Sequence, residues 1–507
     1  MAVATLDVGQ ISDLDTWCKA AEETSVGLTW IEYRQASGRR VPEDEQNKGV
    51  LSKQMEDLSK RLLFLVDKGN IPRSSVPTIL INDCIYNSQK SVSFPLQMEI
   101  EEMRNKVTAK GYALSDGRPV TLNTWRLYNG ENLKKHEVRD PVFHMLVEDA
   151  YRLLGPKVSV FLNTSRENFT RHNMTAFDSF AELAEMSTEK ILEIIKKVGR
   201  YAKKPFEEAA EELWPTLVGR KPKPEDDFYV MRSAVSNVIN PMFPKIEPKK
   251  LILELMNEDL QIGNFVHYVE IDSERREGKM SSPVTFGIRV PSIVKLQYIE
   301  RIPFEDIQMV LHEAGHSANF SCVDPSRPYW DKYVSNPAKA EVFSILFERL
   351  ATDPVFLKKK IGLTDDEKIK KIQELSRFHE LHFMVFYAAN SLLKIAILDK
   401  GLDIDQAVEM YKKLTAEYGL PLPGMYWLAH HVLPQTDYIY EPSYILANIR
   451  AADMNARFVD EYGEDWWRNN EASKYLVKTA FHPGNSVNLD EFSSIDSNAY
   501  FKEVGVI

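Results

Sequence analysis

One pattern constrains the fold of this chain more than any other: the H-E-x-x-H of His312-Glu313-Ala314-Gly315-His316. Histidines four residues apart lie one turn apart on the same face of a helix, where two imidazoles can bind one zinc ion. The glutamate between them then points at a water molecule held by the metal. The pattern H-E-x-x-H fixes only three residues in five and also occurs by chance in a long chain. Whether it indicates a metal site therefore depends on the surrounding sequence.

The residues around the motif favour a real helix. Apolar residues recur at i, i+3, i+4 and i+7, the spacing of a buried helical stripe: Ile307, Val310, Leu311 and Ala314. Pro303 and the two acidic residues at 305 and 306 are typical of a first helical turn. A buried helix rarely carries two histidines and a glutamate without a function for them, so we interpret the motif as a metal site.

Composition narrows the class of protein. With 507 residues, 44% of them apolar and 27% charged, the chain has the profile of a soluble globular protein with a sizeable core. The formal net charge of −11 argues against a nucleic-acid partner or an anionic membrane surface, since both favour a basic face. We see no run of about 18 apolar residues, and so expect no membrane span.

The cysteines indicate a reducing compartment. Cys18, Cys84 and Cys322 form an odd and sparse set, which is neither a disulfide framework nor a cysteine-rich zinc site. Together with an N-terminal segment that lacks a basic start and an apolar stretch, they lead us to expect a cytoplasmic protein. Cys322 follows His316 by six residues and either approaches the site or fills the core, and we favour the core.

Helical spacing dominates the rest of the chain. We predict helices over Leu51–Asp67, Met186–Tyr201 and Asp405–Tyr418, and one long or two consecutive helices over Asp365–Leu398. Strand-like segments are few: Thr78–Ile85, Val158–Leu162 and Val284–Tyr298. Stretches rich in proline and charge predict loops over Arg220–Asp227 and Asn240–Lys250. The predicted fold class is therefore mostly α, with a small β-sheet beside the motif helix.

A third metal ligand is expected, because a catalytic zinc usually takes three protein ligands and leaves one position open. Glu341 follows His316 by 25 positions in a periodic segment of mostly apolar residues. The alternative is an exposed helix with surface glutamates, but these apolar neighbours suit a buried, metal-paired carboxylate better. Glu348 lies seven residues on, on the same helix face, and is a candidate to accept a hydrogen bond from a ligand histidine.

These residues carry a resemblance to the glutamate-type zinc peptidases. The segment from Glu341 to Glu348 is similar to E-S-Q-S-R-L-W-E of the carboxypeptidase Taq family, and the segment from Tyr440 to Ala452 is similar to its Y-F-P-T-Y-x-L-G-N-x-x-A-A. The segment 277–286 resembles the G-K-x-x-G-A-F of the related thimet oligopeptidase and oligoendopeptidase F family. The similarity covers roughly residues 265–460.

The resemblance implies a large, two-lobed helical peptidase fold with a deep channel over the metal. Residues 1–240 would then form one wall of the channel and residues 241–507 the zinc-binding catalytic region, within one integrated peptidase domain. It assigns binding of the tetrahedral intermediate to the hydroxyl of Tyr444, a part that a neutral phenol near zinc can perform. A packed aromatic residue on a helix begun by Pro442 is the alternative.

Other residues of this segment are candidates through the same resemblance. Relatives keep a histidine where this chain has His430 and His431, so one of the two is expected to steady the intermediate, and a role in loop structure is the alternative. Tyr438 and Tyr440 are candidates for substrate binding or for support of the metal ligands. The sequence does not distinguish His430 from His431.

The chain also departs from both families. The H-P-F and D-x-R-x-T segments of carboxypeptidase Taq relatives are absent, and Phe386 replaces an arginine that follows their L-H. The glycine-rich loop of the oligopeptidases is replaced by the residues 433–437. The expected metal centre is thus kept while the recognition motifs are not, which predicts a divergent member with an unusual substrate.

The sequence therefore predicts a metallopeptidase, an oligopeptidase or a metallocarboxypeptidase, that hydrolyses short peptides with one Zn²⁺ per chain. Mn²⁺ or Co²⁺ would suit the same ligands. One alternative is a zinc enzyme of the same fold that acts on a non-peptide amide or a specialised metabolite, and another is an inactive peptidase-like binding protein. Cleavage specificity stays open, as does a homodimer.

Overall fold

The computed structural model describes residues 7–109, 112–113, 119–120, 136–227, 230–231, 235–280, 282–300, 303–420, 422–429, 434, 436 and 438–507. Helices make up 73% of the chain and strands 4%, so the predicted mostly-α class is confirmed. His430 and His431 lie outside the described residues.

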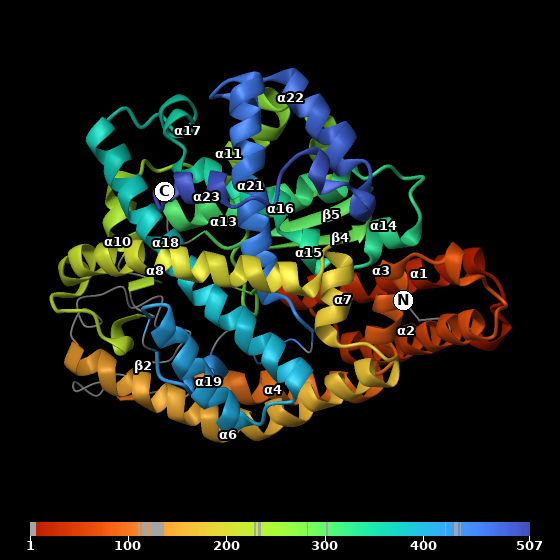
Figure 1. The fold of residues 1–507 in the computed structure, drawn as a ribbon. Helices are drawn as coiled ribbons and strands as arrows, with labels where there is room; N and C mark the ends of the chain where they lie inside the picture. Colours follow the sequence, from red (N-terminus) through yellow and green to blue (C-terminus); the bar gives the residue numbers. More distant parts are fainter. Residues whose placement is uncertain are drawn as a thin grey trace.

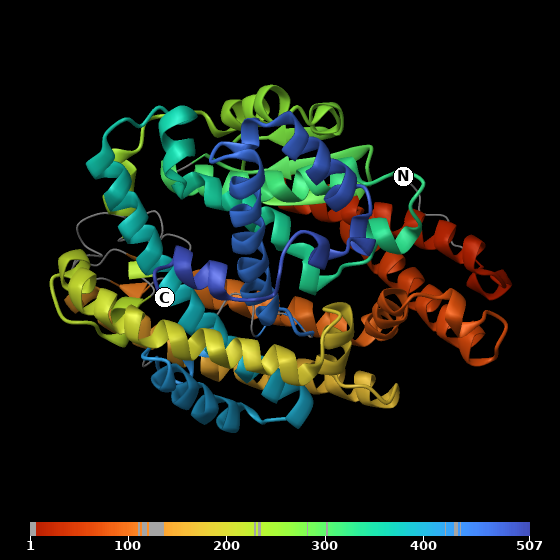
Figure 2. The same ribbon diagram turned by 45° about the horizontal axis from the view of Figure 1, so that its top comes forward.

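The N-terminal half consists of helices, with a short two-stranded hairpin (Figure 1). The helices are α1 (Leu14–Ala36), α2 (Asp44–Asp67), α3 (Thr78–Asn87), α4 (Lys90–Ala109), α6 (His136–Arg171), α7 (Ala176–Leu183) and α8 (Thr188–Val218), and the strands are β1 (Tyr112–Ala113) and β2 (Pro119–Val120). The pair α1 and α2 projects from one side of the molecule in both Figure 1 and Figure 2. Trp17 of α1 fixes the pair, because its indole Nε1 donates a hydrogen bond to the carbonyl oxygen of Leu58 in α2 at 2.7 Å.

The C-terminal half contains the motif helix α13, the long helices α18 and α21, and a series of short helices. In chain order they are α10 (Val235–Ile239), α11 (Pro248–Glu254), α12 (Gly263–Tyr268), α13 (Pro303–Cys322), α14 (Tyr329–Tyr333), α15 (Pro337–Ala340), α16 (Val342–Glu348), α17 (Pro354–Lys359), α18 (Asp366–Lys400), α19 (Ile404–Glu417), α20 (Tyr426–Ala429), α21 (Glu441–Tyr462), α22 (Asn470–Tyr475) and α23 (Asn498–Glu503).

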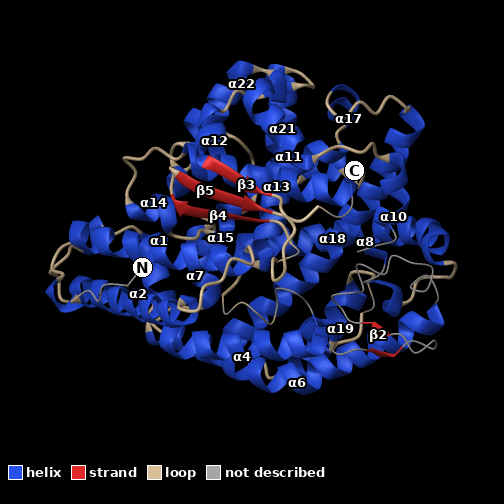
Figure 3. Ribbon diagram, turned by 180° about the vertical axis from the view of Figure 1, so that it is seen from behind, coloured by secondary structure: helices blue, strands red, loops and turns tan. Residues whose placement is uncertain are grey.

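A three-stranded sheet lies beside α13 (Figure 3). Its order is β3 (Val269–Asp272), β5 (Ile293–Gln297), β4 (Val284–Arg289), with β3 parallel and β4 antiparallel to β5. The strands β4 and β5 form the segment that the sequence predicted to be extended, and both pack on α13. The position of β4 at the edge of the sheet brings its residues to the metal-site helix on one side and to a cavity on the other.

The other two predicted strands are wrong. Thr78–Ile85 belongs to α3, and Val158–Leu162 lies within the long helix α6. Both are short apolar runs, and periodicity over so few residues does not separate a strand from a buried stretch of helix. The predicted helices are confirmed with shifted ends, and Asp365–Leu398 forms the single helix α18 rather than two.

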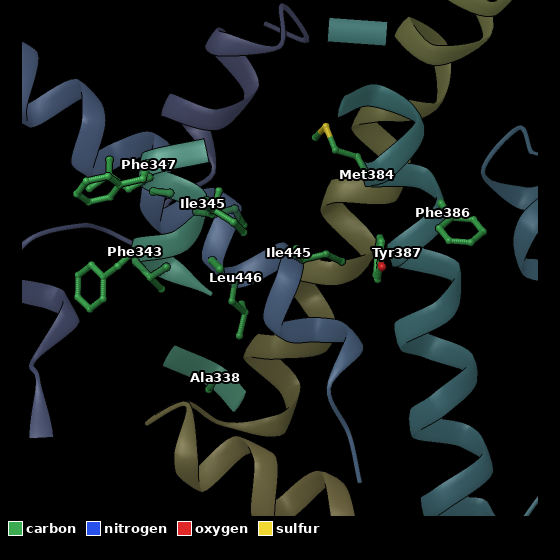
Figure 4. Packing of buried hydrophobic residues seen from close by; sticks show 14 of the residues in the cluster. Ala338, Phe343, Ile345, Phe347, Met384, Phe386, Tyr387, Ile445 and Leu446 are labelled. Atoms are coloured by element: carbon green, nitrogen blue, oxygen red, sulfur yellow. The ribbon is translucent and has the colours of Figure 1, made fainter. Parts of the chain in front are cut away.

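One continuous cluster of buried apolar side chains extends from Ile11 to Val504, so the two halves of the chain share a core. Figure 4 shows part of it, where Ile445 and Leu446 of α21 lie between the side chains of α16 and Tyr387 of α18. Among the described helices, α18 alone has the length and composition to cross a membrane, and 94% of its most apolar window is buried inside the protein. It occupies the place of a central core helix.

Candidate metal centre

The helix α13 presents His312 and His316 together. Ile307, Val310, Leu311 and Ala314 are all at most 1% exposed, so the predicted apolar stripe faces the core and fixes how the helix is rotated. The two imidazole rings then lie 5.0 Å apart between centroids and nearly perpendicular, at 80°.

Glu341 joins the two histidines from a separate element. It was predicted to lie within a helix, but the helix is interrupted there: Glu341 ends α15 and precedes α16. Its Oε2 lies 3.2 Å from Nε2 of His312 and 3.5 Å from Nε2 of His316. Ser344, one turn into α16, donates a hydrogen bond to the same Oε2 at 3.0 Å and holds the carboxylate in place.

The three ligand atoms fit a zinc ion. They lie within 4.8 Å of one another, and the carboxylate is buried. Two ligand atoms about 2.0 to 2.1 Å from a tetrahedral zinc are about 3.3 to 3.4 Å apart, which matches both distances from Glu341 to the histidines. Two imidazoles and a carboxylate are also a donor set that catalytic zinc uses, with the fourth position left open.

Glu348 contacts the outer nitrogen of His312. Its Oε2 lies 2.8 Å from Nδ1 of His312, and its Oε1 accepts a hydrogen bond from Nε2 of Gln308 at 3.0 Å. A carboxylate at Nδ1 keeps the proton on that nitrogen and leaves the lone pair of Nε2 directed at the metal position. The sequence predicted this contact of Glu348 with a ligand histidine. The contact of Gln308 with Glu348 was not predicted. Gln308 lies one turn before His312 on the same helix face.

The charges around these histidines favour a cation. Burial alone would lower the pKa of His312, but its hydrogen bonds and charge interactions with Glu341 and Glu348 outweigh burial and hold the pKa well above its usual range. Burial alone would raise the pKa of Glu341, but hydrogen bonds from His312 and His316 outweigh it and hold the pKa well below its usual range. The buried carboxylates therefore favour a positive charge at this place, which a proton on His312 or, in its stead, a bound cation would supply.

Glu313 is held by its backbone and not by its side chain. Its carbonyl oxygen accepts hydrogen bonds from the hydroxyls of Thr285 in β4 and Ser317 in α13, both at 2.9 Å. Its side chain is largely buried, with the residue 7% exposed, and in the described part of the chain no hydrogen bond or ion pair engages the carboxylate. A buried carboxylate without a partner is suited to exchange a proton with a small molecule at the metal position.

Tyrosines from the start of α21 cover the other side of Glu341. The hydroxyl of Tyr440 donates a short hydrogen bond to Oε1 of Glu341. The ring of Tyr444 packs against that of Tyr440, with 5.3 Å between centroids, and against that of Tyr387 at 4.8 Å. Burial first, and then neighbouring groups that include the Glu341 carboxylate, raise the pKa of both Tyr440 and Tyr444 well above the ordinary value. Both phenols thus stay protonated and able to donate.

A fully buried lysine contacts residues that lie close to these tyrosines in the chain. Lys394 of α18 donates hydrogen bonds to the carbonyl oxygen and the hydroxyl of Thr436, and its Nζ lies 4.0 Å from Oε1 of Glu441. Both side chains of this pair are 0% exposed. Lys394 was not predicted to have a role, since a lysine within an apolar helix pattern gives no sign of an ion pair with Glu441, 47 residues away.

Cys322 does not contribute to the site. It is 1% exposed within the core, and burial raises the pKa of its thiol to about 12, so it is not a thiolate ligand. The prediction of a buried core residue is confirmed.

A cavity of about 700 Å³ lies next to the metal centre. Its lining comes from helices α1 to α4, α6, α7, α13 and α14, from strand β4, and from the segments 335–337 and 438–439. None of the three metal ligands lines it, but Thr285 borders both the cavity and Glu313. The ring of Tyr438 also lines the cavity and lies 6.0 Å from the ring of Tyr440.

No protein-family model matches the chain, and no curated protein matches it. The resemblance to the zinc peptidases therefore rests on the sequence motifs alone.

Proposed function

We propose that the protein is a zinc-dependent peptidase that hydrolyses peptide bonds in short peptides. One observation carries the proposal: His312, His316 and Glu341 converge at zinc-ligand spacing, while the carboxylate of Glu313, on the same helix as the histidines, has no partner among the described residues. Residues brought together over 25 positions of sequence in this way are not expected of a chance H-E-x-x-H. A bound zinc ion would supply a positive charge that acidifies water and polarises a carbonyl group.

The chain's own residues can perform the remaining steps. Glu313 takes a proton from the attacking water and delivers it to the leaving amine, a role that typically contributes about 10²–10⁴ in rate. The neutral phenol of Tyr444, packed against Tyr440, is the candidate donor to the developing oxyanion, where one donor is typically worth about 10²–10³, while the hydroxyl of Tyr440 is engaged by Glu341. Glu348 holds His312 in the tautomer that binds metal.

The sheet supports a peptide as the substrate class. β4 is an edge strand, and its residues Thr285, Phe286 and Gly287 line the cavity. An edge strand offers backbone donors and acceptors that an extended peptide can pair with, which gives affinity without a requirement for one sequence. A cavity of about 700 Å³ falls in the range of sites for small ligands, which suits short peptides rather than folded proteins.

The test compares zinc content and cleavage of a mixed library of short peptides, read by mass spectrometry, in wild type and Glu313→Gln. We expect Glu313→Gln to retain stoichiometric zinc and to lose turnover, while Glu258→Gln, on an exposed residue away from the site, keeps both. His316→Ala and Glu341→Ala should lose metal.

Other outcomes would redirect the assignment. Full activity of Glu313→Gln would refute the mechanism, and stoichiometric zinc in both ligand variants would remove them as ligands. Bound zinc with no cleaved peptide, but with another Glu313-dependent turnover, would favour a non-peptide amide substrate. Zinc without any turnover would favour a binding protein.

A further inference from the structure

The cavity beside the metal centre contains charged groups that the proposed hydrolysis does not use. Asp83 of α3, Glu32 of α1 and Glu101 of α4 line it, together with three lysines. The number of acidic and basic side chains in the lining is equal, so its net charge does not indicate a ligand. The two sets differ in whether each charged group already has a partner in the protein.

The lysines of the cavity are engaged elsewhere. Lys332 lies 3.4 Å from the carboxylate of Glu22, which is not part of the lining. Lys90 lies over an aromatic ring at 4.4 Å, and Lys48 over another at 5.3 Å, in the geometry of cation–π contacts. Lys48 also donates a hydrogen bond to a glutamine side chain at 3.3 Å.

The carboxylates have no such counterparts. Across the described ranges of the chain, no cationic side chain lies within ion-pair distance of Asp83, Glu32 or Glu101. Asp83 has a hydrogen bond from Asn87 on its own helix, and burial, opposed by the charge of Lys90, raises the pKa of its carboxyl to about 6. At neutral pH this carboxylate is therefore mostly ionised and lacks a bound positive charge.

The neighbouring residue supplies a second, independent sign of a missing donor. Asn82 lines the cavity and is 3% exposed. Its Nδ2 donates to the carboxylate of Glu182 at 3.2 Å, but within the part of the chain that the structure describes its Oδ1 accepts no hydrogen bond. A buried acceptor without a donor costs free energy in the ligand-free protein and is satisfied when a donor binds.

The path from α3 to the metal centre is short. Tyr86, one turn beyond Asn82 and Asp83, contacts the ring of Tyr438 at 5.4 Å between centroids, and Tyr438 contacts Tyr440 at 6.0 Å. An extended peptide advances about 3.3 Å per residue, so roughly four residues cover these two steps. A peptide of this length covers the distance from Tyr440, which contacts the candidate ligand Glu341, to Tyr86 on α3.

We propose that this cavity binds a cationic group of the peptide substrate, with Asp83 as the counter-charge and Oδ1 of Asn82 as an additional acceptor. The inference names a substrate class and rests on the proposed function. An ammonium or guanidinium group has a positive charge, several donors and no acceptor, which matches a carboxylate without a cationic partner beside an amide oxygen without a donor. The cation is either a lysine or arginine side chain or the free amino terminus of the peptide.

The test measures binding and not cleavage, on the zinc-loaded Glu313→Gln variant. The probes are three alanine hexapeptides: an acetylated peptide with one lysine, its acetylated twin with norleucine in place of lysine, and a norleucine peptide with a free amino terminus. Lysine is placed at each position in turn, and affinities are measured by calorimetry. We expect at least one cationic probe to bind at least tenfold more tightly than the acetylated norleucine twin.

The variant Asp83→Asn in the same background should abolish this preference and leave the affinity for the twin unchanged. Asp57→Asn, the same change at a position of α2 outside the cavity lining and 43% exposed, should preserve it. The comparison of lysine and free-terminus probes identifies the source of the cation. Equal affinity for all three probes overturns the inference, and so does a preference that survives Asp83→Asn. The probe comparison uses the unaltered cavity, so it stands even where Asp83→Asn does not fold.

The outcome is separable from that of the proposed function. A cationic preference in a protein that cleaves no peptide supports the cation site and overturns the peptidase assignment. Cleavage that depends on Glu313, without any cationic preference, supports the peptidase and overturns the cation site.

Discussion

The glycine of the H-E-A-G-H motif is predicted to determine how closely the two ligand-bearing elements approach. A Cβ added at Gly315 would lie 2.6 Å from the carbonyl oxygen of Phe343 and 2.7 Å from Cα of Ser344. Both atoms belong to the backbone of α16, so no side chain can rotate away to make room. Gly315→Ala therefore has to push α16 away from α13.

The size of the effect follows from these distances. Nonbonded carbon atoms are at rest about 3.5 to 4.0 Å apart, so the backbones have to separate by roughly 1 Å. Overpacking of this kind typically costs about 1–3 kcal/mol, whereas alanine in place of glycine in an unobstructed helix gains about 1 kcal/mol. Because α16 begins directly after Glu341 and ends at Glu348, the same displacement moves both carboxylates. Metal–ligand distances tolerate about 0.2 Å, so zinc affinity should fall by at least tenfold.

The assay is zinc affinity by competition with a chelating dye, together with the melting temperature of the metal-free protein. Gly49→Ala is the matched control, because Gly49 lies inside α2 and a Cβ there would meet nothing within 4 Å. We expect Gly49→Ala to raise the melting temperature and to leave zinc affinity unchanged, and Gly315→Ala to lower both. A Gly315→Ala protein that binds zinc normally and gains stability as the control does would refute the steric reasoning.

Two further predictions concern residues that support the site. Glu348→Gln keeps an acceptor for Nδ1 of His312 but removes the charge, so zinc affinity should fall about 10-fold or more by the same competition assay, and unchanged affinity would contradict the positioning role. Lys394→Met leaves the buried Glu441 unpaired, which should cost about 3–5 kcal/mol in denaturant unfolding. Burial already raises the pKa of Glu441 against the opposing charge of Lys394, so the folded variant binds a proton more readily than the unfolded chain does, and its lost stability should return in part as the pH falls. The double variant Lys394→Met/Glu441→Gln should be more stable than the single one, and a lower stability would exclude the pairing.

Sequence patterns that extend over several residues predicted the helices and some of the strands correctly. The helix around His312 was readable because its apolar stripe repeats over two turns, and every stripe residue is buried. The strands at 284–298 were readable because they run for several residues beside turn signals. Thr78–Ile85 was wrong, since eight mostly apolar residues satisfy a strand and a buried helix alike, and only packing against α2, α6 and α7 decides for the helix.

Contacts between distant residues were predicted less well. Glu341 was found through its spacing from the motif and its apolar neighbours, but the helix break that turns its carboxylate toward the histidines was not. Tyr440 was a candidate for substrate binding or for support of the metal ligands, but its contact with Glu341, 99 positions away, was not predicted. The proposed cation site on α3 has no sequence motif, because its evidence is a carboxylate without a cationic partner and an amide oxygen without a donor among the described residues, which only the folded chain shows.

The motif itself shows why ligand residues are easier to predict than the geometry that brings them together. In H-E-x-x-H the two middle positions are free by definition, yet here Ala314 is fully buried and Gly315 lies against the backbone of α16. A larger residue at 315 would leave all three ligands in the sequence and move one of them out of reach. Three positions of the sequence therefore supply the candidate ligands, and a pattern can identify them. A fourth position, Gly315, allows the ligands to converge, and its importance is seen only when α16 is packed against α13. For this reason Gly315→Ala, rather than the loss of a ligand, tests most directly whether the packing of α13 on α16 builds the site.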